Sequence, residues 1–409
     1  MTRTVVLAPD GFKGSITASA ACAALADGWR SIDPHARIVL RPMADGGEGT
    51  LDAFASAVEG ARRMPVVVTG PDGRERDAAW LLLPPTADAP HGTGVVELAS
   101  TSGIELLGDD RHPWDAHTLG FGQAIAAALD HGVSRLILGI GSSASTDGGS
   151  GLLTALGARF TDAAGRPVAL GLRGLADVAR ADLEQLRPVP PGGALVLCDV
   201  TAPLLGPGGA AAVFGPQKGL PPSDIAAADA ALAHFARLLP AGSPHAPGAG
   251  AAGGTGFALQ AWGGRTVSGA VEIAQLVDLS TAVESASLVI TGEGAYDGQS
   301  GTGKAPAHVA ALAAEAGVPV ALVAGRVAPE ADLRRFSASI SLTVLAGSGA
   351  AALAHPARWL HAAARVLAER TPCPERVREI SEAGQLPWDG ASGSRAAQGQ
   401  PMSPQSRRR

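Results

Sequence analysis

Residues 42–50 read Pro-Met-Ala-Asp-Gly-Gly-Glu-Gly-Thr, and the interpretation of the whole chain starts from this stretch. It follows the apolar run 38–40 and precedes an alanine-rich helical pattern over 51–58, so we expect a strand-to-helix turn. Its glycines allow positive φ angles and the close approach of a ligand, and the helix start offers free N–H groups to an anion. Asp45 and Glu48 would then serve as Mg²⁺ ligands or as a proton acceptor beside a phosphate. The simpler alternative, equally open on these residues alone, is a turn in which Asp45 only caps the helix.

Composition limits the classes of protein to which this chain of 409 residues can belong. An apolar fraction of 46% is enough for real cores, and the length allows about two or three domains. With 4% aromatic residues and a net charge of −6, the chain lacks the stacking surface and the basic face of a nucleic-acid-binding protein. It shows no signal pattern and no apolar run long enough for a membrane helix. Cys22, Cys198 and Cys373 have no paired spacing, so a reduced, cytoplasmic enzyme is expected.

Apolar runs followed by glycine-rich turns and helices recur along the chain. Residues 4–9 predict a buried strand that leads through Asp-Gly-Phe-Lys-Gly-Ser (10–15) into a helix over 16–29. This order is typical of a parallel sheet that binds ligands at the carboxyl ends of its strands. Lys13 in the turn is a candidate phosphate or carboxylate contact, the alternative being a solvated loop lysine.

The sequence pattern changes in the middle of the chain. Residues 64–69 and 76–83 flank a Pro-Asp-Gly turn and predict a β-hairpin, which suggests that a second domain is inserted here. Further along we expect a hairpin over 158–168, a strand over 343–345 and a helix over 350–368. From residue 371 on, little apolar content remains, and the tail 371–409 is predicted to be disordered.

Two further loops invite a phosphate-binding interpretation. Residues 141–149, Gly-Ser-Ser-Ala-Ser-Thr-Asp-Gly-Gly, crowd N–H and O–H donors that suit an anion, the alternative being a long turn of small residues. Residues 298–304, Gly-Gln-Ser-Gly-Thr-Gly-Lys, have the spacing of a P-loop, but Ala305 stands where the Mg²⁺-binding hydroxyl would be. We therefore reject the P-loop, while Lys304 at a helix start remains a candidate phosphate contact.

Together these loops resemble the bacterial glycerate kinases of type 1, over about residues 5–368. The segments that carry the resemblance are Ala-Pro-Asp-Gly-Phe-Lys-Gly-Ser (8–15), Met-Ala-Asp-Gly-Gly-Glu-Gly-Thr (43–50), Cys-Asp-Val-Thr (198–201), Gly-Pro-Gln-Lys-Gly (215–219), Gly-Ala-Gly-Ala-Ala-Gly-Gly (248–254), Thr-Gly-Glu-Gly (291–294), Asp-Gly-Gln (297–299) and Gly-Lys-Ala-Pro (303–306). Each segment is short, and their joint order and spacing make the resemblance specific. The chain departs from the family pattern at three places: Ser142 replaces a second glycine, Ser145-Thr146 replace Thr-Asn, and Thr302 stands where a histidine is common.

The resemblance implies an ATP-dependent kinase of D-glycerate with an α/β fold. It implies one discontinuous, flavodoxin- or Rossmann-like domain (1–63 and 280–370), a central mixed-sheet insertion (64–279), and an active site in the cleft between them. The favoured product is 2-phosphoglycerate rather than 3-phosphoglycerate. ATP and Mg²⁺ are the expected cofactors, and a monomer or homodimer without nucleic-acid or membrane partners is expected.

Phosphoryl transfer needs positioning and charge neutralisation more than covalent chemistry, and the candidate residues are assigned on that basis. The catalytic candidates are Asp45 as general base, Asp147 as the alternative base, and Lys13. The nucleotide-binding candidates are Lys218, Lys304, Gly303, Gly292, Gly294 and Ser143. The Mg²⁺ candidates are Glu48, Asp199 and Glu293.

Other functions stay open on the sequence alone. One is a kinase of a related small hydroxy acid. A dinucleotide-dependent oxidoreductase would need Gly-x-Gly-x-x-Gly at the first helix, and residues 10–15 lack that pattern. A non-catalytic sugar-acid binding protein would not need so many carboxylates beside glycines, and ATP consumption would separate it from a kinase.

Overall fold

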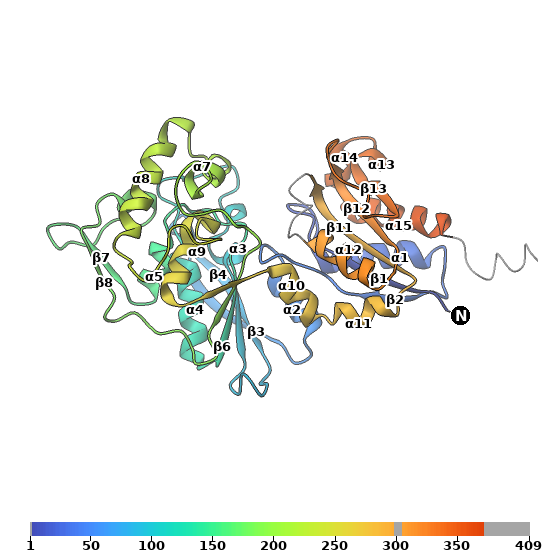
Figure 1. Ribbon diagram of the computed structural model, residues 1–409, viewed down its shortest axis with the longest axis horizontal. Helices are drawn as coiled ribbons and strands as arrows, with labels where there is room; N and C mark the ends of the chain where they lie inside the picture. Colours follow the sequence, from blue (N-terminus) through green and yellow to red (C-terminus); the bar gives the residue numbers. More distant parts are fainter. Residues whose placement is uncertain (1, 298–304, 372–409) are drawn as a thin grey trace, which may run out of the picture. The chain divides into compact units, whose positions relative to one another are not determined.

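Two β-sheets organise the fold (Figure 1). The computed structural model describes residues 2–297 and 305–371, of which Thr2–Glu369 form one unit. The first sheet has five strands in the order β13-β12-β11-β1-β2, and the second has six in the order β10-β9-β6-β5-β4-β3. The predicted α/β class, with one parallel and one mixed sheet, is confirmed. None of the helices in the described ranges is both long and apolar enough to cross a membrane.

The first sheet is built from strands near both ends of the described chain. These are β1 (Thr4–Pro9), β2 (Arg37–Leu40), β11 (Leu288–Tyr296), β12 (Val320–Val327) and β13 (Ala338–Ser341). Every neighbouring pair is parallel. Strands β1 and β11 are adjacent although they are far apart in sequence, and the strand order reverses between them. The loops that follow these two strands therefore lie at a topological switch point, where open α/β sheets bind ligands.

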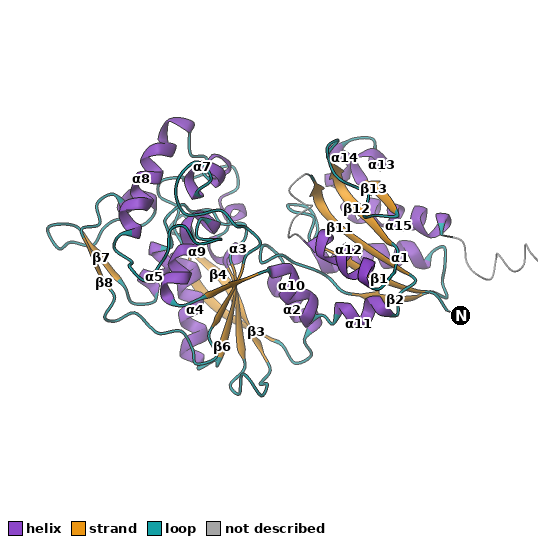
Figure 2. Ribbon diagram, viewed as in Figure 1, coloured by secondary structure: helices purple, strands orange, loops and turns teal. Residues whose placement is uncertain are grey.

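Helices cover both faces of the first sheet (Figure 2). Alternate residues of β1 point to opposite faces, so Val5 and Leu7 belong to one core and Val6 to another. The first core contains α1 (Ala18–Arg30) and α15 (Pro356–Arg370). The second core contains α2 (Thr50–Ala57), α10 (Gly269–Leu276), α11 (Leu279–Glu284) and α12 (Ala305–Glu315).

The second sheet begins with antiparallel strands and continues with parallel ones. Its strands are β3 (Arg62–Thr69), β4 (Glu75–Leu83), β5 (Thr93–Glu97), β6 (Arg135–Gly139), β9 (Ala194–Leu197) and β10 (Arg265–Val267). One face packs on α4 (Leu119–His131), α5 (Ser150–Ala155), α8 (Ile225–Ala236) and α9 (Ala251–Trp262). The other face places Leu81, Val95 and Leu197 in the core that holds α2 and α10. Helices α2 and α10 thus connect the two sheets through one shared core.

Two sequence predictions about local structure are wrong, and a third is confirmed. The chain is helical at 343–345, in α13 (Leu342–Ala346), because β13 has already ended and Leu342 turns into the core. The single helix predicted over 350–368 is two helices, α14 (Gly349–Ala354) and α15, because Pro356 begins a new helix. The predicted hairpin over 158–168 is present: the N–H of Asp162 donates to the Arg166 carbonyl at 2.9 Å and the N–H of Val168 to the Phe160 carbonyl at 3.2 Å. On its other side β7 (Arg159–Thr161) pairs with β8 (Arg180–Asp182). Short helices complete the described chain: α3 (Leu98–Ser102), α6 (Leu172–Leu175) and α7 (Ala210–Phe214).

The turn after β2 packs backbone against backbone on the second sheet. Gly46 has a φ of 96°, and a Cβ atom there would stand 2.7 Å from the carbonyl oxygen of Leu197. A Cβ on Gly141 would stand 2.4 Å from the Cα of Gly47, and the N–H of Gly141 donates to the Gly46 carbonyl at 2.9 Å. Gly46 is therefore required by close packing as well as by its positive φ, whereas Gly49, with a φ of 89° and open space around its Cβ position, is required by turn geometry alone.

Substitution of Gly46 tests this packing. Gly46→Ala combines a left-handed φ with a backbone clash, so we expect it to lower the free energy of unfolding by more than about 2 kcal/mol. Gly73→Ala is the matched control, because Gly73 also has a positive φ, of 79°, but open space around its Cβ position. It should cost only about 1 kcal/mol. Equal costs for the two variants, measured by urea denaturation, would contradict the packing argument.

Candidate active site

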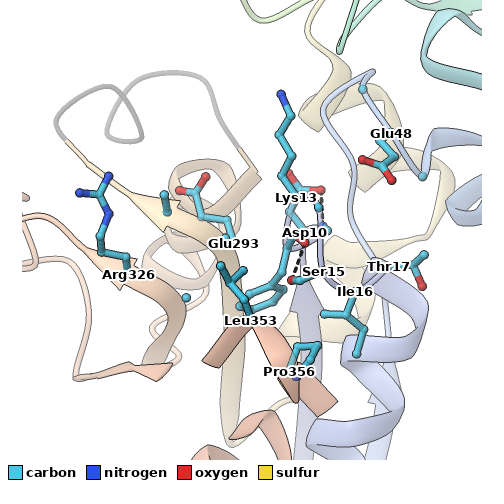
Figure 3. Close-up of a pocket in the computed structure, with 18 of the residues that line it drawn as sticks. Asp10, Lys13, Ser15, Ile16, Thr17, Glu48, Glu293, Arg326, Leu353 and Pro356 are labelled. Atoms are coloured by element: carbon cyan, nitrogen blue, oxygen red, sulfur yellow. Dashed lines mark hydrogen bonds between the residues drawn. The ribbon is translucent and has the colours of Figure 1, made fainter. Parts of the chain in front are cut away.

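A large pocket lies at the carboxyl edge of the first sheet (Figure 3). Its volume is about 1090 Å³, at the upper end of the roughly 300–1,000 Å³ usual for ligand sites. The walls come from the loop after β1, the turn 45–49, β11 and the end of β12. Glu105 and Ser142, from the part of the chain that carries the second sheet, also line it. Loops of both sheets therefore meet at one cavity.

Asp45 and Glu48 both line this pocket. Asp45 is half-buried, and its Oδ1 accepts the N–H of Gly47 at 3.1 Å, which fixes the carboxylate within the turn. Glu48 is exposed and lies in the pocket wall (Figure 3). The N-cap of α2 is Gly49, without a side-chain cap. The alternative in which Asp45 only caps the helix is therefore wrong.

A backbone N–H in the first turn of α2 donates a hydrogen bond to a side chain of the second sheet. Glu97 ends β5, and its Oε2 accepts the N–H of Leu51 at 3.0 Å. The pKa of Glu97 is raised to about 7, mainly by burial; the hydrogen bond from Leu51 opposes this rise, and the charges of Asp52 and Glu48 contribute to it. Sequence reasoning missed this residue, whose one signal is a carboxylate at the end of an apolar run. Glu97 holds the helix that follows Asp45 and Glu48.

Two cations line the pocket among the described residues, Lys13 and Arg326. Lys13 is exposed in the loop that a hydrogen bond from the N–H of Phe12 to the Ile16 carbonyl closes at 2.9 Å. Arg326 is exposed near the end of β12, and in Figure 3 it lies on the opposite side of Glu293 from Lys13. Sequence reasoning missed Arg326, although Ala-Gly-Arg after an apolar run repeats the strand–glycine–charge pattern of the other loops.

The two glycines of β11 that were predicted to bind the nucleotide, Gly292 and Gly294, have different surroundings. Gly294 lines the pocket beside Glu293, and a Cβ there would stand 3.1 Å from the backbone nitrogen of Lys13. Gly292 does not line the pocket. A Cβ there would stand 2.0 Å from the carbonyl oxygen of Val323 on the neighbouring strand β12. Gly292 is thus needed for strand packing. The predicted residues Gly303 and Lys304 lie outside the described residues, as does the predicted tail apart from Thr371.

Lys218 and Ser143 lie behind the pocket wall rather than on it. The Lys218 amine donates to the Ser143 hydroxyl at 3.1 Å and to the carbonyl of Ser145. Burial lowers the pKa of Lys218 to about 7, and the charge of Asp147 opposes this shift. Ser143 directly follows Ser142, which does line the pocket. This buried cluster supports the loop that forms that part of the wall.

Asp147 and Asp199 also lie outside the pocket lining. Asp147 is fully buried. Its oxygens accept four hydrogen bonds, from the N–H groups of Thr118, Gly149 and Gly151 and from the hydroxyl of Thr118. Asp199 accepts the N–H groups of Gly269 and Ala270 at 3.1 and 3.4 Å, at the start of α10. Burial raises the pKa of Asp199 to about 6, and the charge of Asp45 adds to the rise. Both geometries are those of anchoring carboxylates.

The chemistry of the pocket fits a magnesium ion that arrives with phosphate groups. Within the described ranges no group of three or more His, Cys, Asp or Glu side chains could hold a metal ion by itself. Mg²⁺ is usually bound by one or two carboxylates together with substrate phosphates and water. Glu48 and Glu293 each present a carboxylate to the pocket, so either one can hold such an ion together with the phosphates of a nucleotide.

Comparison with known proteins gives one consistent result. A sequence profile of the glycerate kinase family matches residues 5–371. The glycerate kinase of Halalkalibacterium halodurans is 41% identical over 329 residues, or 79% of this chain and 85% of that protein. The glycerate 2-kinase of Escherichia coli K12 is 40% identical over 328 residues, or 78% of this chain and 84% of that protein. A crystal structure of a candidate glycerate kinase 2 from Salmonella typhimurium LT2 matches with a TM-score of 0.73 and 35% identity, covering 94% of this chain and 100% of that one.

Glu97 leads to a prediction about stability and pH. Its pKa rises from 4.5 in the ordinary case to about 7 in the fold, so the folded state binds this proton more tightly than the unfolded state. The stability that this contributes is complete below pH 4.5 and is lost as the pH rises through about 7. Glu97→Gln stays uncharged, so its stability relative to wild type should increase over that window, by on the order of 3 kcal/mol at most.

Thermal melting between pH 4.5 and 8 measures this effect, with Glu105→Gln as a control at an exposed position. The melting temperature of Glu97→Gln minus that of wild type should increase with pH, whereas the control difference should stay flat. A Glu97→Gln difference that is independent of pH would contradict a buried, proton-binding Glu97.

Proposed function

We propose that this chain, which belongs to the glycerate kinase family, transfers the γ-phosphoryl group of ATP to a hydroxyl of D-glycerate. As a member of that family the chain is a phosphotransferase. The observation that supports this reaction is the pocket of about 1090 Å³ in which carboxylates and cations from loops of both sheets meet. Catalysis of phosphoryl transfer consists mainly of holding donor and acceptor in line and neutralising charge, and the pocket carries groups of both kinds.

Asp45 is the general base in this proposal. It lines the pocket, and the Gly47 N–H holds its carboxylate in one place. As the glycerate oxygen forms its bond to the γ-phosphorus, the bond from that phosphorus to the β–γ bridging oxygen breaks and ADP leaves. The proton of the attacking hydroxyl passes to Asp45. Lys13 and Arg326, which line the same pocket, neutralise the charge of the phosphoryl oxygens.

Charge also argues for a divalent cation. Among the described lining residues, the carboxylates are Asp10, Asp45, Glu48, Glu105, Glu293 and Asp297, and the cations are Lys13 and Arg326. A polyanionic nucleotide would be repelled by this excess of negative charge unless a cation entered with it. Glu48 and Glu293 would hold Mg²⁺, which when bound neutralises charge on the phosphate oxygens.

The buried groups have supporting roles in this scheme. Asp147, Lys218 and Ser143 hold the wall that carries Ser142, and Asp199 holds the start of α10. We retain the two-domain division proposed from sequence, with segments 1–63 and 280–370 around the first sheet and 64–279 around the second. Helix α10 lies inside segment 64–279 but packs with α2 and α12 in the shared core, so in this proposal the second segment ends before α10 instead of at residue 279.

The first test is the product. Purified protein with D-glycerate and Mg-ATP should release ADP and form 2-phosphoglycerate, the product implied by the name of its Escherichia coli relative, glycerate 2-kinase. Phosphorus NMR distinguishes 2-phosphoglycerate from 3-phosphoglycerate, and a coupled assay measures ADP. Release of ADP with another hydroxy acid but none with D-glycerate would overturn the substrate assignment.

The second test is Asp45→Asn. Asparagine keeps the oxygen that accepts the Gly47 N–H but cannot take the proton, so the fold should persist while kcat falls about 10²–10⁴-fold. Asp88→Asn, at an exposed position outside the pocket lining, is the control and should keep wild-type turnover. Circular dichroism confirms folding of both. If Asp45→Asn turns over at the wild-type rate, Asp45 is not the base.

A further inference from the structure

The pocket is apolar at one end. The apolar residues of its lining include Ile16, Ala20, Leu342, Ala352, Leu353 and Pro356. In the view of Figure 3, the side chains of Leu353, Ile16 and Pro356 lie to one side of Asp10, and the Lys13 amine extends to the other. Leu353 lines the pocket, and 63% of its surface is exposed, so its apolar side chain is accessible to a ligand.

This apolar end is built by the segment in which local sequence signals were misleading. The chain turns from β13 directly into α13, and the Thr343 hydroxyl donates to the carbonyl of Gly325 at 2.9 Å, which ties α13 to β12. The break before Pro356 then separates α14 from α15. Leu353 on α14 is thereby set across the pocket from Ile16, which the loop after β1 supplies.

We propose that this apolar end binds the purine base of the nucleotide, with Leu353 and Ile16 contacting the base. The inference rests on the proposed kinase function and extends it to the orientation of the nucleotide. The triphosphate then runs toward Lys13 and Arg326, and the acceptor lies at the end formed by Asp45, Glu48 and Ser142.

The chemistry of the two substrates decides between the two possible orientations. A nucleobase presents flat faces that gain from apolar contact, whereas glycerate carries a carboxylate and hydroxyls with little apolar surface. The reverse orientation would place the base among Asp45, Glu48 and Glu105, and it would leave Leu353 exposed to water. Only the first orientation brings the γ-phosphate near Asp45, the proposed general base.

Binding of ADP by calorimetry, in the presence of Mg²⁺ and without glycerate, tests the inference. Leu353→Ala should raise the Kd for ADP about 10-fold or more, because contact with the base is lost. Leu353→Met keeps the apolar volume and should stay within about twofold of wild type. Val344→Ala is the matched control: Val344 is 80% exposed on the neighbouring α13 but does not line the pocket, so its loss should leave the Kd unchanged.

Inorganic tripolyphosphate separates base contact from a general disturbance of the site. It has no base, so Leu353→Ala should leave its affinity unchanged, and the KM for D-glycerate should also be unchanged. Wild-type ADP affinity in Leu353→Ala, or an equal loss for tripolyphosphate, would overturn the inference while leaving the kinase proposal intact. A wild-type protein that binds no ADP would overturn both.

Discussion

The structure depends on a contact between backbones that leaves no room for side chains. Where the turn after β2 meets the ends of β6 and β9, a Cβ on Gly46, Gly139 or Gly141 would come within 2.4–2.7 Å of another backbone atom. The hydrogen bond from the N–H of Gly141 to the carbonyl of buried Gly46 pairs two backbone groups across this contact. Because the loops approach so closely, Asp45 from one sheet and Ser142 from the other line the same pocket.

Three adjacent strands of the second sheet, β5, β6 and β9, all end on this contact. Strand β6 ends at Gly139, one of these glycines. Strand β5 ends in Glu97, which accepts an N–H of α2. Strand β9 leads to Asp199, which accepts two N–H groups at the start of α10. The first N–H groups of a helix lack partners within the helix, and its N-terminus favours negative charge. Burial nevertheless raises the pKa of both carboxyls. Their geometry thus separates anchoring carboxylates from Asp45 and Glu48, which face the cavity.

Local signals predicted β1 and β2 and the turns after them, because a buried run followed by glycine and a helix start is visible in adjacent residues. They did not predict the edge strand β13. The signal at residues 343–345 misled because β-branched residues favour strands only weakly, and the burial of Leu342 decided the conformation. The roles of Glu97 and Arg326 were hidden for a different reason. Each acts on residues far away in sequence, and a single sequence carries no sign of such a pairing. Asp147 and Lys218 were found as polar residues, but their burial became evident only from the fold.

Ser142 shows how the wall of the pocket tolerates strain. The family resemblance of the sequence implies a glycine at this position, and the φ of 58° at Ser142 suits one, since a residue with a side chain adopts this conformation at a cost of about 1–2 kcal/mol. The surrounding structure holds the conformation: the Ser142 carbonyl accepts the N–H of Ile104 at 2.8 Å, and Gly103 forms a β-bridge with Ser143. What the substitution adds is a hydroxyl in the pocket lining, where a Cβ on Gly47 would lie 3.7 Å from its oxygen. The strained residue thus places a polar group on the pocket lining, close to the turn that carries Asp45.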